Sequence, residues 1–160
     1  MLGLLCGEQS HGWSLVTALR PSGEIGKVWA SSRPRVYRAI SLLGERGYVN
    51  KEGVEDSTVG PSRTLLRATP AGRRALTRWL ETPVEHIRDV RSELLLKLLL
   101  LHRLGGDPAR LVAAQRQRFC DLTETLERNL ASAEGFDRTL ALWRSTTATA
   151  TLGFLEKLGR

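Results

Sequence analysis

Apolar residues recur at helical spacing in three segments near the start of the chain, separated by turn-forming residues. The pattern predicts a short helix over 1–6 and a second helix over 12–20, with Ser10 as its N-cap. A third helix is expected to open at Ser31-Ser32-Arg33-Pro34, with a serine as its cap, and to end before Gly47. Its apolar stripe has the i, i+3, i+4, i+7 spacing and consists of Val36, Ala39, Ile40 and Leu43.

A β-hairpin is predicted directly after the third helix. Residues 48–55 and 63–68 have strand-like composition, and residues 56–62 between them are dense in turn formers. A fourth helix is then predicted over 70–81, because Thr69 can cap it and Pro70 is tolerated in a first turn. The order of three helices, a hairpin and a fourth helix is that of a winged helix-turn-helix domain.

The second half of the chain predicts helices only. Residues 82–88 contain one proline and mixed charges, and they are the predicted boundary between a winged helix-turn-helix domain at 1–81 and a helical domain at 89–160. Helices are expected over 90–104, from Pro108 to about 133, and over 137–158. The expected fold is mostly α, with the C-terminal helices antiparallel.

A long apolar seam indicates self-association. Between Val112 and Ala133, apolar residues alternate at spacings of three and four, as in a coiled coil. This seam exceeds what a small domain covers alone, so we expect a homodimer. The last helix carries a second set on one face: Leu140, Trp143, Thr147, Ala150, Phe154 and Leu158.

Positive charge is concentrated in the first half. The formal net charge is +7, and residues 1–80 hold 12 Lys/Arg against 6 Asp/Glu, whereas residues 81–160 hold 12 against 11. A basic N-terminal half fits a partner such as double-stranded DNA, whose major groove of about 12 Å admits one helix. The candidate DNA contacts are Arg33, Arg35 and Arg38 on the third helix and Lys51, Arg63 and Arg67 in the hairpin.

Five stretches, in their order and spacing, resemble the PadR-like family of transcriptional regulators. They are Leu2–Leu5; Ser10-His11-Gly12-Trp13; Val36-Tyr37-Arg38-Ala39-Ile40 with Glu45-Arg46-Gly47-Tyr48-Val49; Gly60-Pro61 with Leu66–Gly72; and Trp79-Leu80 with Arg91–Leu98. The resemblance covers residues 2 to about 100. Two departures are Trp13 and Leu66, which stand where relatives commonly have tyrosine.

The resemblance implies a homodimer that binds an inverted-repeat operator, mostly to repress transcription, and that is released by a small aromatic effector near the dimer interface. It places Tyr37 close to the phosphate backbone, and Ser32 joins the predicted DNA contacts at the start of the same helix. Trp143 and Phe154 are the predicted lining of an effector pocket. The alternative is that these two aromatic residues are ordinary interface core.

Other classes of function find little support. The sequence lacks paired carboxylates, a metal-ligand cluster, a glycine-rich phosphate loop and triad spacing, so we expect no enzyme, no metal site and no cofactor. His11 beside Ser10 is interpreted as a packing residue at a helix start. Cys6 and Cys120 are expected to be reduced and buried.

No secretory leader and no apolar run of membrane length occur, which predicts a cytoplasmic protein with no membrane partner. The leading hypothesis is a homodimeric DNA-binding repressor. A second hypothesis from the same layout is a winged-helix module that binds protein and has no operator specificity.

Overall fold

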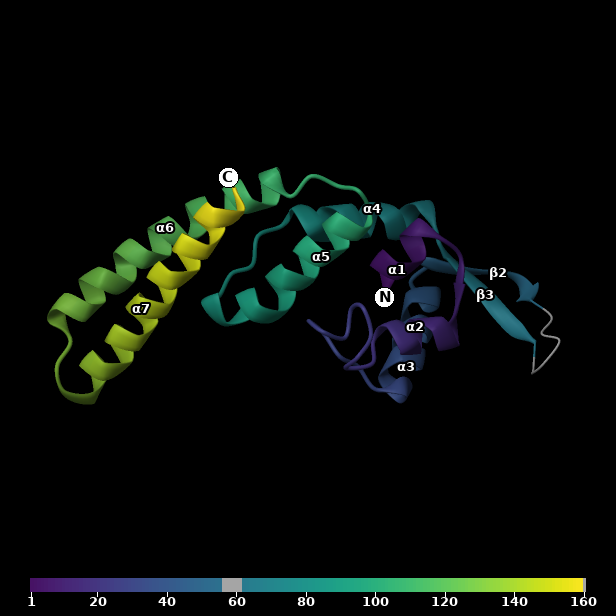
Figure 1. The fold of residues 1–160 in the computed structure, drawn as a ribbon, viewed down its shortest axis with the longest axis horizontal. Helices are drawn as coiled ribbons and strands as arrows, with labels where there is room; N and C mark the ends of the chain where they lie inside the picture. The colour runs from purple at the N-terminus through teal and green to yellow at the C-terminus, as the bar shows by residue number, and fades with distance from the viewer. Residues whose placement is uncertain (56–61, 160) are drawn as a thin grey trace.

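The computed structural model describes residues 1–55 and 62–159, and it is mostly helical with one small antiparallel sheet (Figure 1). The predicted winged helix-turn-helix fold is confirmed. The elements of this part are α1 (Leu2–Gly7), β1 (Ser10–His11), α2 (Gly12–Ala18), α3 (Arg33–Glu45), β2 (Val49–Glu55), β3 (Arg63–Ala68) and α4 (Pro70–Glu81). The predicted turn at 56–62 lies, apart from Ser62, outside the described residues.

The sheet has three strands in the order β1-β3-β2, and both neighbouring pairs are antiparallel. Strand β1 is two residues long and pairs Ser10 with Leu66 and His11 with Leu65. The prediction that Ser10 caps α2 is therefore wrong. The N-cap is His11, whose Nδ1 accepts a hydrogen bond from the Ser14 N–H at 3.2 Å.

Helix boundaries around the hairpin follow the predicted signals. Ser32 is the N-cap position of α3, although its side chain makes no capping hydrogen bond. Gly47 follows the C-cap of α3 with φ of +67°, the left-handed conformation that favours glycine. The Thr69 Oγ1 accepts from the Gly72 N–H at 3.1 Å and donates to the Gly47 carbonyl at 2.7 Å, so one side chain links α4 to the end of α3.

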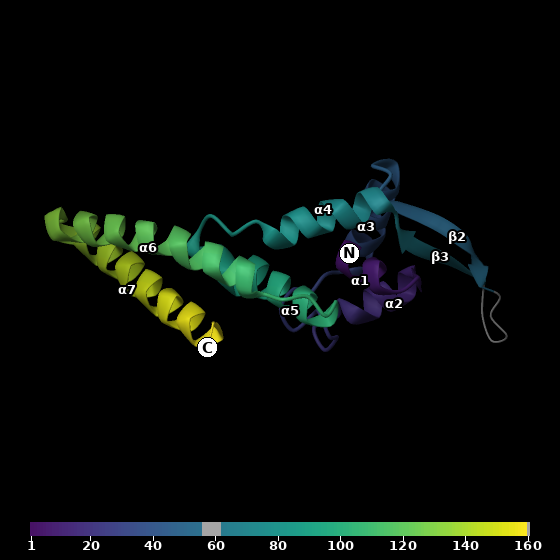
Figure 2. The same ribbon diagram turned by 90° about the horizontal axis from the view of Figure 1, so that it is seen from above.

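The second half consists of helical segments that extend away from the sheet (Figures 1 and 2). The single helix predicted over 90–104 begins instead with a 3₁₀ turn and a π-helical turn. The elements are the 3₁₀ turn Ile87–Asp89, the π-helical turn Val90–Leu94, α5 (Leu95–Arg103), α6 (Ala109–Ser132) and α7 (Gly135–Leu158). Helices α6 and α7 form an antiparallel hairpin at the end of the molecule opposite the β2–β3 wing.

Two hydrophobic cores share the segment that leads through α5. The first core is built from α1–α4 and the sheet, and it includes Leu100 of α5. The second core lies between α6, α7 and the segment before α5, and it includes the fully buried Leu94 and Phe119. The division into domains at 1–81 and 89–160 stays a prediction.

Lys97 lies between the two cores on α5 and is only 1% exposed. Its Nζ donates to the Thr82 carbonyl at 2.6 Å, pairs with the Glu93 carboxylate at 2.9 Å, and lies 4.8 Å from the ring centroid of Trp79. A buried ammonium is costly unless its donors are satisfied, and these contacts satisfy them. Lys97 thereby joins the end of α4 to α5.

Helix α7 packs against α6 through small residues and one leucine. The buried set is Ser145, Ala148, Thr151 and Leu155. Several large side chains of α7 remain exposed, among them Phe136 at 79% and Trp143 at 64%. Across the described residues, no helix is long and apolar enough to cross a bilayer.

Candidate nucleic-acid interface

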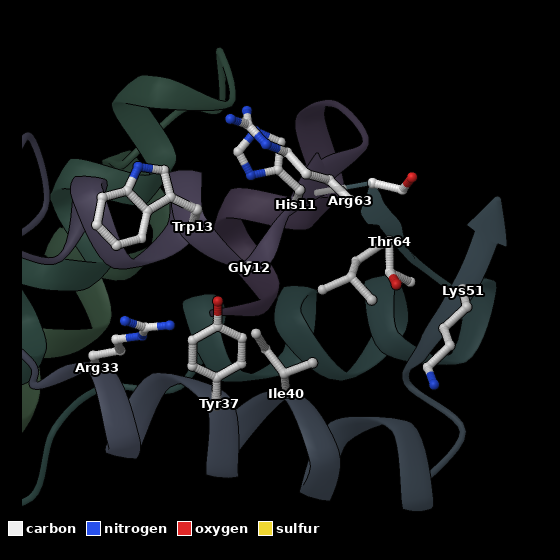
Figure 3. Close-up of a pocket in the computed structure, with 11 residues that line it drawn as sticks. His11, Gly12, Trp13, Arg33, Tyr37, Ile40, Lys51, Arg63 and Thr64 are labelled. Carbon is white, nitrogen blue, oxygen red and sulfur yellow. The ribbon is translucent and has the colours of Figure 1, made fainter. Parts of the chain in front are cut away.

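A groove of about 550 Å³ separates α3 from the sheet and the start of α2 (Figure 3). One wall carries Arg33, Tyr37 and Ile40 of α3, and the facing side chains come from the β1–α2 junction and the hairpin. The remaining lining residues are His11, Gly12, Trp13, Lys51, Ser62, Arg63, Thr64 and Leu66. Four of the lining residues have side-chain N–H groups that can donate hydrogen bonds to an anionic partner: His11, Arg33, Lys51 and Arg63.

The orientation of α3 follows from its apolar stripe. Val36 is buried, and Ala39, Ile40 and Leu43 are partly buried, whereas the opposite face is exposed. Arg35 and Arg38 lie on exposed positions of the helix. Within the described ranges, neither side chain lies within ion-pair distance of a carboxylate. Their charge is therefore available to an external anion.

Arg33 is bounded by two aromatic rings. Its Cζ lies 5.8 Å from the ring centroid of Trp13 and 5.7 Å from that of Tyr37. A second arginine, Arg20, also lies over Trp13, with its Cζ 4.8 Å from the ring centroid. These distances fall within the range of cation–π attraction.

Tyr37 packs directly against the backbone of Gly12 (Figure 3). A Cβ atom on Gly12 would lie 2.8 Å from the Tyr37 Cε1 and 3.2 Å from its Oη. Any larger residue at position 12 would push the ring away. The absent side chain at Gly12 thus lets the hydroxyl end of the tyrosine ring approach the start of α2.

His11 connects the start of α2 to the hairpin along the wall that faces α3. While its Nδ1 caps α2, its Nε2 lies 3.3 Å from the Arg63 Nη1 on β3. Because Nδ1 accepts the Ser14 N–H, the hydrogen of a neutral His11 ring is on Nε2, the atom that faces Arg63. The Arg63 contact is therefore a close approach of two donor groups, which a bound anion that accepts from both would relieve.

A family model described as the transcriptional regulator PadR-like family matches residues 1–78, from α1 to most of α4. Residues 1–78 of the chain belong to the PadR-like family. The matched residues include every element that lines the groove, so the groove lies within the part of the chain that matches the family model.

Several solved structures align along nearly the whole chain. The Bacillus subtilis PadR structure in complex with operator DNA covers 99% of this chain and 95% of its own, with 19% identity and a TM-score of 0.49. The smu.1604c structure from Streptococcus mutans UA159 covers 98% and 94%, with 15% identity and a TM-score of 0.46. Bacillus subtilis PadR in complex with p-coumaric acid covers 98% and 92%, with 18% identity and a TM-score of 0.44. None of the curated proteins matches this sequence.

The groove of this PadR-like chain contains half of the DNA contacts predicted from sequence. Arg33, Tyr37, Lys51 and Arg63 line it together. Ser32, Arg35, Arg38 and Arg67 lie outside it, and the guanidinium of Arg67 is paired with the Glu52 carboxylate at 2.7 Å. All eight assignments stay predictions.

His11, Trp13 and Thr64 are among the groove residues that were not predicted from the sequence as DNA contacts. A signal for the first two was present in the Ser-His-Gly-Trp step at 10–13, which places an imidazole and an indole at the predicted start of a helix. Thr64 had no signal, because a single threonine in a strand does not reveal which face it occupies.

The predicted effector residues are separated in the PadR-like chain. Trp143 lines a cavity of about 830 Å³ between the segment before α5 and the α6–α7 hairpin, together with Leu122 and Leu126 of α6. Phe154 does not line this cavity and packs against the second core instead. The two cysteines also differ, because Cys6 is buried, as expected, whereas Cys120 is exposed, contrary to expectation.

Proposed function

We propose that this PadR-like protein is a homodimeric transcriptional repressor that binds a palindromic operator through α3 and the wing. The observation that carries the proposal is the groove itself, in which side chains of α3 and the hairpin bring four nitrogen-bearing residues to one surface. The neighbouring Arg35 and Arg38 extend the same positive surface along α3. Such a surface suits a helix in the major groove with a wing on the adjacent backbone.

The exposed apolar side chains of α7 support a dimer. Phe136, Leu142, Trp143 and Leu158 are all exposed in the single chain, on the hairpin that projects furthest from the sheet. A second copy related by two-fold symmetry would cover such a surface, since closed two-fold dimers are the commonest assembly. The two α3 helices of such a dimer would bind half-sites about 34 Å apart.

We further propose that a small aromatic effector releases the DNA from a site beside Trp143. The cavity there combines an indole and leucine side chains with Arg88, Arg91 and Arg144. An effector acts only if it binds the free and DNA-bound geometries with different affinities. Because the proposed partner is operator DNA, we propose the cytoplasm as the place of action.

The test starts by selecting bound fragments from a random DNA pool with the full-length protein. We expect an inverted repeat to be enriched and its affinity to fall steeply with salt. The competing hypothesis, a winged-helix module that binds protein, gives no enriched sequence and a shallow salt dependence.

A single substitution then tests whether Arg38 contributes to operator binding. Arg38→Ala is expected to weaken operator binding about tenfold, as the loss of a base or phosphate contact does, while the dimer seen by light scattering persists. Arg138→Ala removes the same charge from an exposed position of α7 and serves as the matched control. Equal affinities of Arg38→Ala and Arg138→Ala in a gel-shift titration would remove Arg38 from the interface.

A further inference from the structure

Trp13 has an exposed indole ring within cation–π range of two arginine side chains. The Arg20 Cζ lies 4.8 Å and the Arg33 Cζ 5.8 Å from the ring centroid. The residue is 43% exposed although indole is among the most apolar side chains. Its contribution therefore lies in what it holds at the surface rather than in filling the core.

The two neighbouring rings leave the Arg33 guanidinium ready to bind. Its Cζ lies within cation–π range of both rings, and the N–H donors of a guanidinium lie in its own plane, where a partner can reach them. No carboxylate among residues 1–54 and 62–159 lies within ion-pair distance of Arg33. An arginine without such neighbouring rings loses more rotamer freedom when it binds, which weakens binding.

We propose that Trp13 is a positioning residue that determines operator specificity by orienting Arg33 toward a base edge. This inference rests on the proposed function. Arg33 is the first residue of α3, and the N-terminal residues of a recognition helix are those that contact base edges. The partner that best fits a planar, pre-oriented guanidinium is guanine, through its O6 and N7 atoms.

The rings of Trp13 and Tyr37 come from different helices, so the position of Arg33 depends on how α2 packs against α3. Arg20 also lies close to the indole of Trp13, and this contact adds to the restraint on the ring. The four side chains form an alternating series of arginine and aromatic ring in the order Arg20, Trp13, Arg33 and Tyr37.

The experiment is a double-mutant cycle on the operator that the wild-type protein selects from a random pool. Affinities are measured by fluorescence anisotropy for Trp13→Leu, Arg33→Ala and the double variant, with folding checked by urea denaturation. Trp13→Leu is expected to weaken binding about two- to fivefold, which corresponds to an exposed cation–π contact. The double variant is expected to bind no more weakly than Arg33→Ala, because without Arg33 the indole has nothing to orient.

Two further measurements separate positioning from general stability. Selection with Trp13→Leu and with Arg33→Ala is expected to relax preference at the same base pair, and Trp13→Phe is expected to restore most of that preference. Trp29→Leu is the matched control, because Trp29 is 47% exposed and lies outside the groove. Its effect on affinity is expected to add to that of Arg33→Ala.

Additive losses for Trp13→Leu and Arg33→Ala, or an unchanged base preference in Trp13→Leu, overturn the positioning role while leaving the proposed function intact. Failure of the wild-type protein to enrich any sequence overturns the proposed function, and this inference with it.

Discussion

The side-chain amide of Gln115 forms a pair of hydrogen bonds with the backbone of Val84. Its Oε1 accepts from the Val84 N–H at 2.7 Å, and its Nε2 donates to the Val84 carbonyl at 3.0 Å. Gln115 is fully buried in α6, and Val84 is buried in the irregular segment after α4. The amide thus satisfies a backbone that has no neighbouring strand and fixes this segment to α6.

Gln115→Ala is expected to lower the free energy of unfolding by about 2–4 kcal/mol, because it leaves the buried N–H and carbonyl of Val84 without partners. Urea denaturation measures the change. Gln117→Ala is the control on the same helix, since Gln117 is exposed, and its effect is expected to stay within about 0.5 kcal/mol. Equal losses in the two variants would show that the Val84 contact contributes nothing specific.

The ion pair between Arg67 and Glu52 withholds one positive charge of the wing from a DNA partner. Glu52→Gln is expected to raise affinity for the operator about three- to tenfold at low salt, because a negative charge near the phosphates is removed. Stability is expected to change little, since both side chains are exposed and such pairs contribute about 0–1 kcal/mol.

Glu134→Gln removes the same charge between α6 and α7, far from the wing, and provides the comparison. A salt titration of both variants distinguishes a local effect from one of net charge. If both raise affinity equally, Arg67 makes no contact of its own with DNA.

Gly12→Ala is expected to weaken operator binding about fivefold, equivalent to about 1 kcal/mol, because its Cβ displaces the Tyr37 ring from the groove. Combined with Tyr37→Ala, the substitution is expected to cause no additional loss. Gly153→Ala on α7 meets no atom within 4 Å and is expected to leave DNA binding unchanged. Additive losses from Gly12→Ala and Tyr37→Ala would contradict the displacement.

The two cysteines are expected to react at very different rates. Burial raises the pKa of the Cys6 thiol, against smaller opposing effects of Arg73 and the N-terminal amine. With an alkylating reagent at pH 8, mass spectrometry is expected to find Cys120 modified and Cys6 unmodified until denaturant is added. Fast labelling that persists in Cys120→Ser would contradict this expectation.

The raised pKa also has a consequence for stability. Above about pH 8.5 the unfolded chain releases the Cys6 proton while the folded chain retains it. The contribution of Cys6 to the free energy of unfolding therefore falls as the pH rises above that value. Cys6→Ala is expected to remove this part of the alkaline decline, as pH-dependent urea denaturation would show.

Local signals in the sequence were sufficient where capping and turn chemistry determine the structure. Thr69 and Pro70 fixed the start of α4, and β3 was predicted over its observed bounds of 63–68. Strand β1 was missed because two residues are too few to show alternation, and its pairing with Leu65 and Leu66 joins segments more than fifty residues apart.

Tertiary contacts explain the remaining differences. The leucine-rich segment 94–101 has no polar face, so its sequence does not indicate where a regular helix begins or which core each leucine enters. Helix α7 buries Ser145 and Ala148, whereas larger apolar side chains of the helix stay exposed, because small residues permit the close approach of α6. A tertiary contact also explains why His11 and Trp13 were not predicted to line the groove, since they enter it through the pairing of β1 with β3.

The two hydrophobic cores share one short helical segment, so a movement of one core is transmitted to the other. Leu94 and Leu100 belong to different cores, and the buried Lys97 between them is bonded to the end of α4. Packed cores resist continuous deformation, so this segment cannot swivel on its own. We expect any tilt of the α6–α7 hairpin to move α5 with it as a rigid body. In the proposed dimer, the angle between the two α6–α7 hairpins would then determine the distance between the two α3 helices.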